Sequence, residues 1–259
     1  MAINKSDYYE YHKLTEGVYA LLAKKESKIL MNAGLIDLGD GVITFDLAGF
    51  PGAYEEARRA AEELFGKPVL GTVISHGELA RAAAANEGLY KPVLSSSVGD
   101  RLEQLMPDKK KHKLAVLHGE RQKLERRLEL ADDDLTREGL LERIKKAEEQ
   151  QQLLHNSSLV LPAVTFERTL RLYGTARVAE LTAFGPARTQ SDTVLFLPQE
   201  RILFGGGLVG SGHSLPQVDG EASGWQNALR ELSKLDARCI VPGRGNAGGA
   251  ELLDSAGLE

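Results

Sequence analysis

The stretch GPARTQSDTVLFLPQERILFGGGLV, residues 185–209, decides the fold of this 259-residue chain. Two apolar runs, Val194–Leu197 and Ile202–Phe204, are separated by the polar residues PQER, which predicts two strands joined by a turn. Three glycines follow at 205–207. They do not form a phosphate-binding loop, because the Gly-Lys-Ser/Thr ending of such a loop is absent from this stretch. The stretch therefore predicts part of a β-sheet.

The segments before this stretch predict strands, a helix and a further strand. The turn residues Gly39-Asp40-Gly41 between apolar runs predict a β-meander. The helical spacing over 53–65 ends at Gly66, a C-cap residue, with Pro68 just beyond. This order indicates an α/β layer architecture. The expected strands are 14–23, 28–36, 42–46, 69–75, 166–172, 178–182 and 239–241, and a second helix is expected over 220–235.

The middle of the chain, residues 101–156, has a different composition, rich in charged residues and leucine. Leu114, Leu117, Leu124 and Leu128 have the spacing of one helical stripe. A second stripe contains Leu140, Ile144 and Ala147, and Asp132–Asp134 supply a break with an N-cap. We predict an inserted α-helical hairpin whose charges, including Lys109–Lys111, are solvated.

Composition excludes several classes of protein. The mass of 28.2 kDa fits a single domain, 1–259, that carries the hairpin as an insertion. The net charge of -5 does not favour a nucleic-acid or membrane-surface binder. Cys239 is the only cysteine, so the chain can form no internal disulfide and no cysteine-rich zinc site. The polar N-terminus and the lack of a long apolar run predict a cytoplasmic protein.

Three separated segments together resemble the metallo-β-lactamase superfamily: NAGLIDLGDGVITFDLAGF (32–50), GKPVLGTVISHGEL (66–79) and the opening stretch followed by IVPGRG (240–245). The similarity covers residues 14–246 and is greatest to a bacterial subgroup with a helical insertion. It implies an αββα sandwich, in which two mixed β-sheets lie between helical layers. It also implies descent from zinc-dependent hydrolases.

The resemblance also locates the family's metal ligands, and most of them are replaced. In the family motif H-x-H-x-D-H only the first histidine, His76, remains. The other metal positions of the family fall on Glu78, Ala80, Arg81, Arg188, Gly206 and Arg244. A guanidinium has no lone pair to donate to a metal and stays protonated. A catalytic zinc needs about three protein ligands, so we expect no zinc, no other cofactor and no zinc-dependent hydrolysis.

Several hypotheses about function stay open. Arg81, Arg188 and Arg244 could form a pocket for a small anionic ligand, as in a pseudoenzyme, or could be neutralised internally by Glu78 or Asp46. The hairpin could form a homodimer or another assembly. A rearranged single-metal site could use His76, Glu78 and His213. Catalysis by Ser75 is disfavoured, because neighbouring residues of a strand point to opposite faces.

Overall fold

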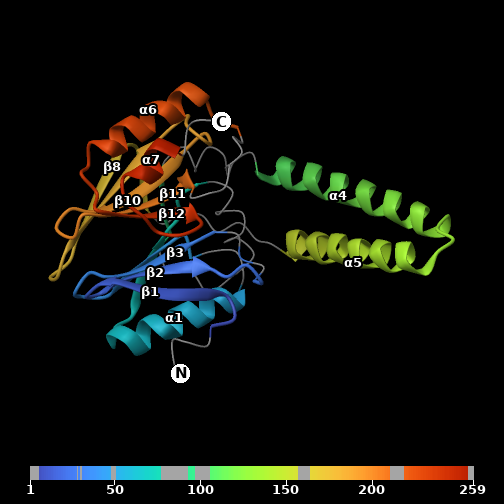
Figure 1. Cartoon of the computed structure of the whole chain (residues 1–259), viewed down its shortest axis with the longest axis horizontal. Coiled ribbons are helices and arrows are strands. Elements are labelled where there is room, and N and C mark those ends of the chain that lie inside the picture. The colour runs from blue at the N-terminus through green and yellow to red at the C-terminus, as the bar shows by residue number, and fades with distance from the viewer. Residues whose placement is uncertain are drawn as a thin grey trace.

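Two mixed β-sheets lie face to face in the computed structural model (Figure 1). The structure describes residues 6–27, 29, 31–47, 51–76, 93–96, 106–156, 164–210 and 219–255. The first sheet has the order β1-β2-β3-β4-β5-β6-β7, antiparallel up to β4 and parallel beyond it. Its strands are β1 (Tyr9–Thr15), β2 (Val18–Ala23), β3 (Ala33–Asp37), β4 (Val42–Phe45), β5 (Val69–Val73), β6 (Val93–Ser96) and β7 (Val164–Phe166).

The second sheet has the order β12-β11-β10-β9-β8 and is antiparallel except for the pair β11 and β12. Its strands are β8 (Thr169–Tyr173), β9 (Val178–Phe184), β10 (Asp192–Leu197), β11 (Ile202–Gly210) and β12 (Cys239–Arg244). Helix α1 (Pro51–Phe65) covers the first sheet, and α6 (Ala222–Ser233) and α7 (Glu251–Ser255) cover the second (Figure 1). The predicted αββα architecture with two mixed sheets is confirmed.

Each layer boundary has its own apolar cluster. Between the sheets, the rings of Phe45 and Phe204 lie 5.8 Å apart, centroid to centroid. Gly34 lies directly against the ring of Phe204, so β3 passes close to β11 at this point. The other two clusters fill the space between the second sheet and α6 and α7, and between the first sheet and α1. All residues of β10 and β11 are buried, since this sheet is covered on both faces.

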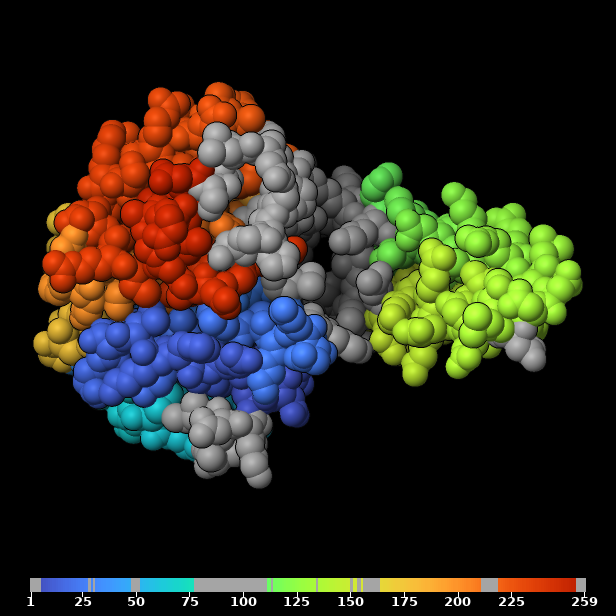
Figure 2. Space-filling view, viewed as in Figure 1, coloured from blue at the N-terminus to red at the C-terminus, as the bar shows by residue number. Residues whose placement is uncertain are grey.

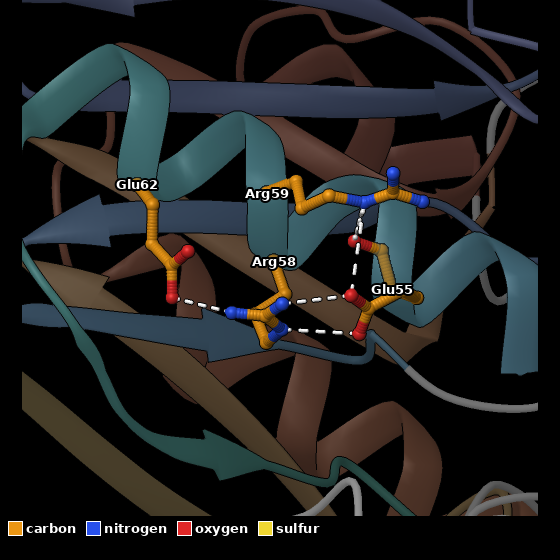
Figure 3. Close-up of polar contacts among 4 residues, drawn as sticks. All are labelled: Glu55, Arg58, Arg59 and Glu62. Carbon is orange, nitrogen blue, oxygen red and sulfur yellow. Dashed lines mark hydrogen bonds and ion pairs between the residues drawn. The ribbon is translucent and has the colours of Figure 1, made fainter.

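Helix α1 has one face buried against the core and one face exposed to solvent. Ala53, Ala57 and Ala61 recur every four residues and are buried against the first sheet. The other side carries an ion-pair network (Figure 3). Arg58 pairs with Glu55 at 2.7 Å and with Glu62 at 2.5 Å, and Arg59 lies 3.7 Å from Glu55. Such partly exposed pairs contribute little to stability, so the buried alanine face holds the helix in place.

Three predicted strands differ clearly from the observed ones. In place of 28–36, strand β3 begins only at Ala33. The segment 14–23 is not one strand, because Gly17, with φ +76, turns the chain between β1 and β2. β1 lies at an edge of the sheet, so most of its residues are at least partly exposed and its sequence looks polar. The segment 166–172 is also not one strand: β7 belongs to the first sheet and β8 to the second, so the chain crosses between the sheets at 167–168.

The inserted helices α4 (Met106–Glu129) and α5 (Asp134–Asn156) project from the sandwich as an arm (Figures 1 and 2). The 24 residues of α4 correspond to a length of about 36 Å. Leu117, Leu140, Ile144 and Ala147 are buried, which matches the predicted stripes. Asp133 accepts a hydrogen bond from the amide of Thr136 at 2.8 Å and so caps α5. Among the described helices, none is long and apolar enough to cross a membrane.

At one end of the sandwich, which we call the turn end, the turns at 16–17, 38–41, 174–177 and 198–201 meet. Arg177 pairs with Glu200 at 3.3 Å and donates a hydrogen bond to the carbonyl oxygen of Glu16 at 2.8 Å. Asp40 accepts hydrogen bonds from the amide and hydroxyl of Thr175, at 2.9 and 3.2 Å. These contacts tie the two sheets together. Since β4 begins at this end, Asp46 and the predicted site lie at the other, the site end.

Candidate functional site

Four of the predicted site positions come together at the site end. His76 follows β5 and forms an isolated β-bridge with Asp192, the first residue of β10. Arg188 lies in the loop between β9 and β10, and Gly206 lies within β11. Arg244 is the last residue of β12, whose Pro242 is paired with Gly206. Segments far apart in the sequence, from both sheets, thus build one site.

Two glycines mark how tightly this site is packed. Gly206 has φ +51, and a Cβ atom there would lie 2.6 Å from Cβ of Ser75 and 3.2 Å from the carbonyl oxygen of Thr193. A Cβ atom on Gly207 would collide with Cδ2 of His76 and lie 2.9 Å from Nη2 of Arg188. The imidazole of His76 and the guanidinium of Arg188 therefore both contact the main chain at Gly207. The guanidinium of Arg188 therefore lies close to His76, the residue that the resemblance aligns with the first histidine of the family motif.

The loop that carries Arg188 is fixed by its own hydrogen bonds. Asp192 accepts a hydrogen bond from the amide of Thr189 at 2.7 Å. The carbonyl oxygen of Ala187 accepts one from the amide of Glu221 at 2.7 Å, just before α6. Gly220 approaches the same carbonyl group too closely for any side chain. Arg188, which is 4% exposed, is therefore held inside the site rather than extended into solvent.

Two buried carboxyl groups lie near Arg188. Oδ1 of Asp46 accepts a hydrogen bond from the amide of Ser75 at 2.7 Å. Within the described residues, Oδ2 of Asp46 and Oδ1 of Asp192 have no hydrogen-bond partner. Burial raises the pKa of Asp46 to about 7, although Ser75 and Arg188 act against this. Burial also raises the pKa of Asp192 to about 6, opposed by the Thr189 amide and Arg188. These carboxyl groups therefore carry incomplete negative charge at neutral pH.

Arg244 completes the described part of the site. It is partly buried, and its Nε atom is enclosed without a hydrogen-bond partner among the described residues. Gly243 before it packs against Met31, whose Cε would lie 2.6 Å from a Cβ atom on that glycine. Asn32 contacts the same loop from the first sheet. Arg244 is thus a second cation whose main chain is held by both sheets.

The side chains at these positions do not supply the set of ligands that a zinc ion needs. His76 offers one imidazole, Gly206 offers no side chain, and Arg188 and Arg244 offer guanidinium groups that cannot ligate a metal. A Cβ atom at Gly206 would also meet Ser75, so any side chain at this position, including a metal-bridging one, would require Ser75 to move. In the parts of the chain that the structure describes, no group of three or more His, Cys, Asp and Glu residues could hold a metal.

The remaining predicted site residues, Glu78, Ala80, Arg81 and His213, lie outside the described residues. The rearranged metal site that needs Glu78 and His213 therefore stays a prediction. Sequence reasoning missed Asp192 and Asn32 as parts of the site. Asp192 had a signal, since it follows Arg188 within the stretch that carries the family resemblance. Asn32 had none, because its partners come 210 and 213 positions later.

Known structures identify the fold. The metallo-β-lactamase FIM-1 from Pseudomonas aeruginosa, in a mono-zinc form, is 16% identical, with 99% of this chain and 96% of that one covered at a TM-score of 0.66. A metallo-β-lactamase from Pontibacter korlensis is 19% identical, with 95% of each chain covered and a TM-score of 0.61. One from Hirschia baltica is 16% identical, with 97% of each chain covered and a TM-score of 0.65.

The chain therefore has the metallo-β-lactamase fold, as the resemblance predicted. At these identities the similarity establishes the fold alone. No family model matches the sequence, and no curated protein matches it.

Proposed function

We propose that this chain, which has the metallo-β-lactamase fold, is a metal-free and non-hydrolytic protein that binds a small anion in the former metal site. The observation that carries the proposal is Arg188. Its buried guanidinium contacts Gly207 beside His76, where the resemblance places a metal. A fixed cation there opposes the binding of a metal ion and favours an anion.

The charge balance of the site supports an anionic ligand. Arg188 and Arg244 are permanently charged, whereas the pKa values of Asp46 and Asp192 are raised to about 7 and about 6. At neutral pH the carboxyl group of Asp46 therefore offsets the charge of Arg188 only in part, although Asp192 and Asp219 also lie nearby. An oxyanion such as phosphate or a carboxylate accepts the forked hydrogen bonds that arginine offers.

Thermal unfolding with inorganic phosphate, sulfate and citrate tests this proposal, with chloride at equal ionic strength as the control. Phosphate at 100 times its Kd would stabilise the fold by about 2.7 kcal/mol. The stabilisation should disappear in Arg188→Ala, decrease in Arg244→Ala and persist in Arg171→Ala, whose arginine pairs with Glu180 on the exposed side of β8. If none of the anions raises the melting temperature above the chloride control, the proposal fails.

The absence of zinc is a separate part of the proposal and has its own test. Isothermal titration with Zn²⁺ should give no saturable binding, and the purified protein should contain no stoichiometric zinc. Stoichiometric zinc that survives Arg188→Ala but is lost on His76→Ala would instead support the rearranged site that includes Glu78 and His213. Zinc with accompanying hydrolysis would overturn the assignment as a pseudoenzyme.

A second candidate function is assembly of the protein into a homodimer through the hairpin. At the tip of the hairpin, Leu130 and Leu135 are 80% and 83% exposed, and Val116 and Leu141 are exposed along its sides. Large apolar side chains at the end of a projecting arm are well placed to be buried against a second copy. This candidate is independent of the anion site.

Sedimentation of the full-length protein and of the double variant Leu130→Ser, Leu135→Ser tests the assembly role. The expected result is a dimer that becomes a monomer in the variant. The matched control is Lys123→Ser, Lys145→Ser, which removes two exposed side chains from the same helices and should leave the dimer intact. A wild-type protein that is a monomer at all concentrations removes this function.

A further inference from the structure

Asn32 precedes β3 in the first sheet and contacts the loop that carries Arg244 in the second. Its side-chain Nδ2 donates hydrogen bonds to the carbonyl oxygens of Pro242, at 2.9 Å, and Gly245, at 2.8 Å. Its backbone amide donates a third, to the carbonyl oxygen of Gly243, at 2.8 Å. Asn32 therefore holds the main chain on both sides of Arg244.

The side chain of Asn32 is fully used at this position. Oδ1 accepts a hydrogen bond from the amide of Ala23 at 2.9 Å, and the whole residue is only 5% exposed. Asparagine offers two amide hydrogens and one acceptor oxygen, which is the set that this environment requires. Aspartate has the same shape, but it would lose both donors and would place a negative charge against two carbonyl oxygens. The contacts thus specify the residue type as well as the size.

The same loop is restrained on its other side. A Cβ atom on Gly243 would collide with the carbonyl oxygen of Gly206 and lie 2.6 Å from Cε of Met31. The main chain before Arg244 is therefore enclosed between β11 and the segment that ends in Asn32. With this backbone fixed, the position of Arg244 at the end of β12 is set before a ligand binds, so the proposed site is prepared in advance.

We propose that Asn32 is the positioning residue of the anion site, which sets Arg244 from the opposite sheet. This inference rests on the proposed anion-binding function. It assigns Asn32 no contact with the ligand, since its polar groups are taken up by Ala23 and the loop. Its effect on binding should therefore act entirely through Arg244.

The first experiment is calorimetric titration of the full chain with inorganic phosphate. Asn32→Asp should raise the Kd about tenfold. If Asn32→Asp does not fold by circular dichroism, Asn32→Ser replaces it. The control is Asp40→Ala, which breaks a contact between the sheets at the turn end and should lower stability without changing the Kd. An unchanged Kd in a folded Asn32 variant overturns the inference.

A double-mutant cycle separates positioning from a general structural role. Arg244→Ala alone should weaken phosphate binding. In the Arg244→Ala background, Asn32→Asp should cause no further change, because Asn32 acts only through the side chain that is already missing. Independent, multiplicative losses in the double variant would show that Asn32 supports the site in another way, and would overturn the inference.

A readout without any anion distinguishes this inference from the proposed function. The Nε–H resonance of Arg244 is assigned by its absence from the spectrum of Arg244→Ala. Asn32→Asp should shift or broaden it, whereas Asp40→Ala should leave it unchanged. If wild-type protein binds no phosphate, the proposed function fails, and the resonance still tests the positioning: an unchanged signal in Asn32→Asp overturns it.

Discussion

At the turn end, the guanidinium of Arg177 lies 3.3 Å from the carboxylate of Glu200, and both side chains are largely enclosed. At the site end, Asp46 and Asp192 are more deeply buried. At both ends some enclosed side-chain atoms have no hydrogen-bond partner among the described residues: one oxygen each of Asp46, Asp192 and Glu200, and two nitrogens of Arg177. The turn end pairs opposite charges directly. At the site end, two carboxyl groups with raised pKa values lie near the buried Arg188.

This difference supports the proposal that the site end binds an anion. An enclosed ion pair between turns of the two sheets helps to fix how the sheets dock. Groups with perturbed pKa values are typical of functional sites. The raised pKa values of Asp46 and Asp192 thus distinguish the site end from the ion pair at the turn end.

The largest expected effect is at the turn end. Arg177→Ala should lower the free energy of unfolding by about 3 kcal/mol, because it leaves Glu200 buried without its counter-charge. Urea unfolding followed by circular dichroism measures the loss. Arg171→Ala, which breaks an exposed pair with Glu180 in the same sheet, should cost much less. Equal losses in the two variants would show that the enclosed ion pair at the turn end contributes no more to stability than an exposed one.

A somewhat smaller effect should follow a change at the site end. Gly206→Asp should cost about 2 kcal/mol, because its Cβ atom would meet Ser75 in a closely packed core. Gly66→Asp is the matched control: Gly66 has a similar φ of +62, but no atom lies within 4 Å of its Cβ position. The control should therefore lose less. Stabilisation of Gly206→Asp by Zn²⁺ would show instead that Ser75 moves and leaves room for a metal-bridging side chain.

The pH dependence of stability should identify Asp46. Its pKa is raised to about 7 in the folded protein and is 3.8 in the unfolded chain. Between these values the folded state holds the extra proton, so the free energy of unfolding falls as the pH rises from about 4 to about 7. Asp46→Asn should remove most of this fall.

Chemical denaturation at a series of pH values gives the comparison between wild type and Asp46→Asn. A smaller slope should remain in the variant up to about pH 6, since the pKa of Asp192 is also raised. Parallel curves for the two proteins would show that Asp46 is not the group responsible.

The smallest effect is expected on the outer face of α1, which lies at neither end. Arg58→Ala removes the pairs with Glu55 and Glu62 and should cost about 0.5 kcal/mol. The loss should shrink in 0.5 M NaCl, because salt screens exposed charges. A loss as large as that of Arg177→Ala would mean that exposure is a poor guide to the value of ion pairs in this protein.

Sequence patterns predicted the elements whose signals are local. The turn at 39–41 and the leucine stripes of the hairpin lie within single segments, so spacing and turn residues revealed them. The two parts of 166–172 could not be separated in this way, because both are short and their division depends on which sheet each part joins. β1 was missed since an edge strand shows too few apolar residues.

The site was predicted only as far as its residues fall within motifs. Arg188, Gly206 and Arg244 were located through their neighbours in the sequence, and the structure brings them together with His76. The burial that raises the pKa of Asp46 comes from packing between segments, which spacing does not encode. The proposed role of Asn32 could not be predicted from spacing either. Its partners are backbone carbonyl oxygens, which every residue type carries.

The contact between Asn32 and Pro242 spans 210 positions of the chain, and the whole site depends on contacts of this kind. Closing such long loops costs conformational entropy before the contacts that repay it exist. Proteins dominated by distant contacts fold slowly. We therefore expect the proposed site to form late during folding. A fragment that contains only one of the two sheets would lack it altogether.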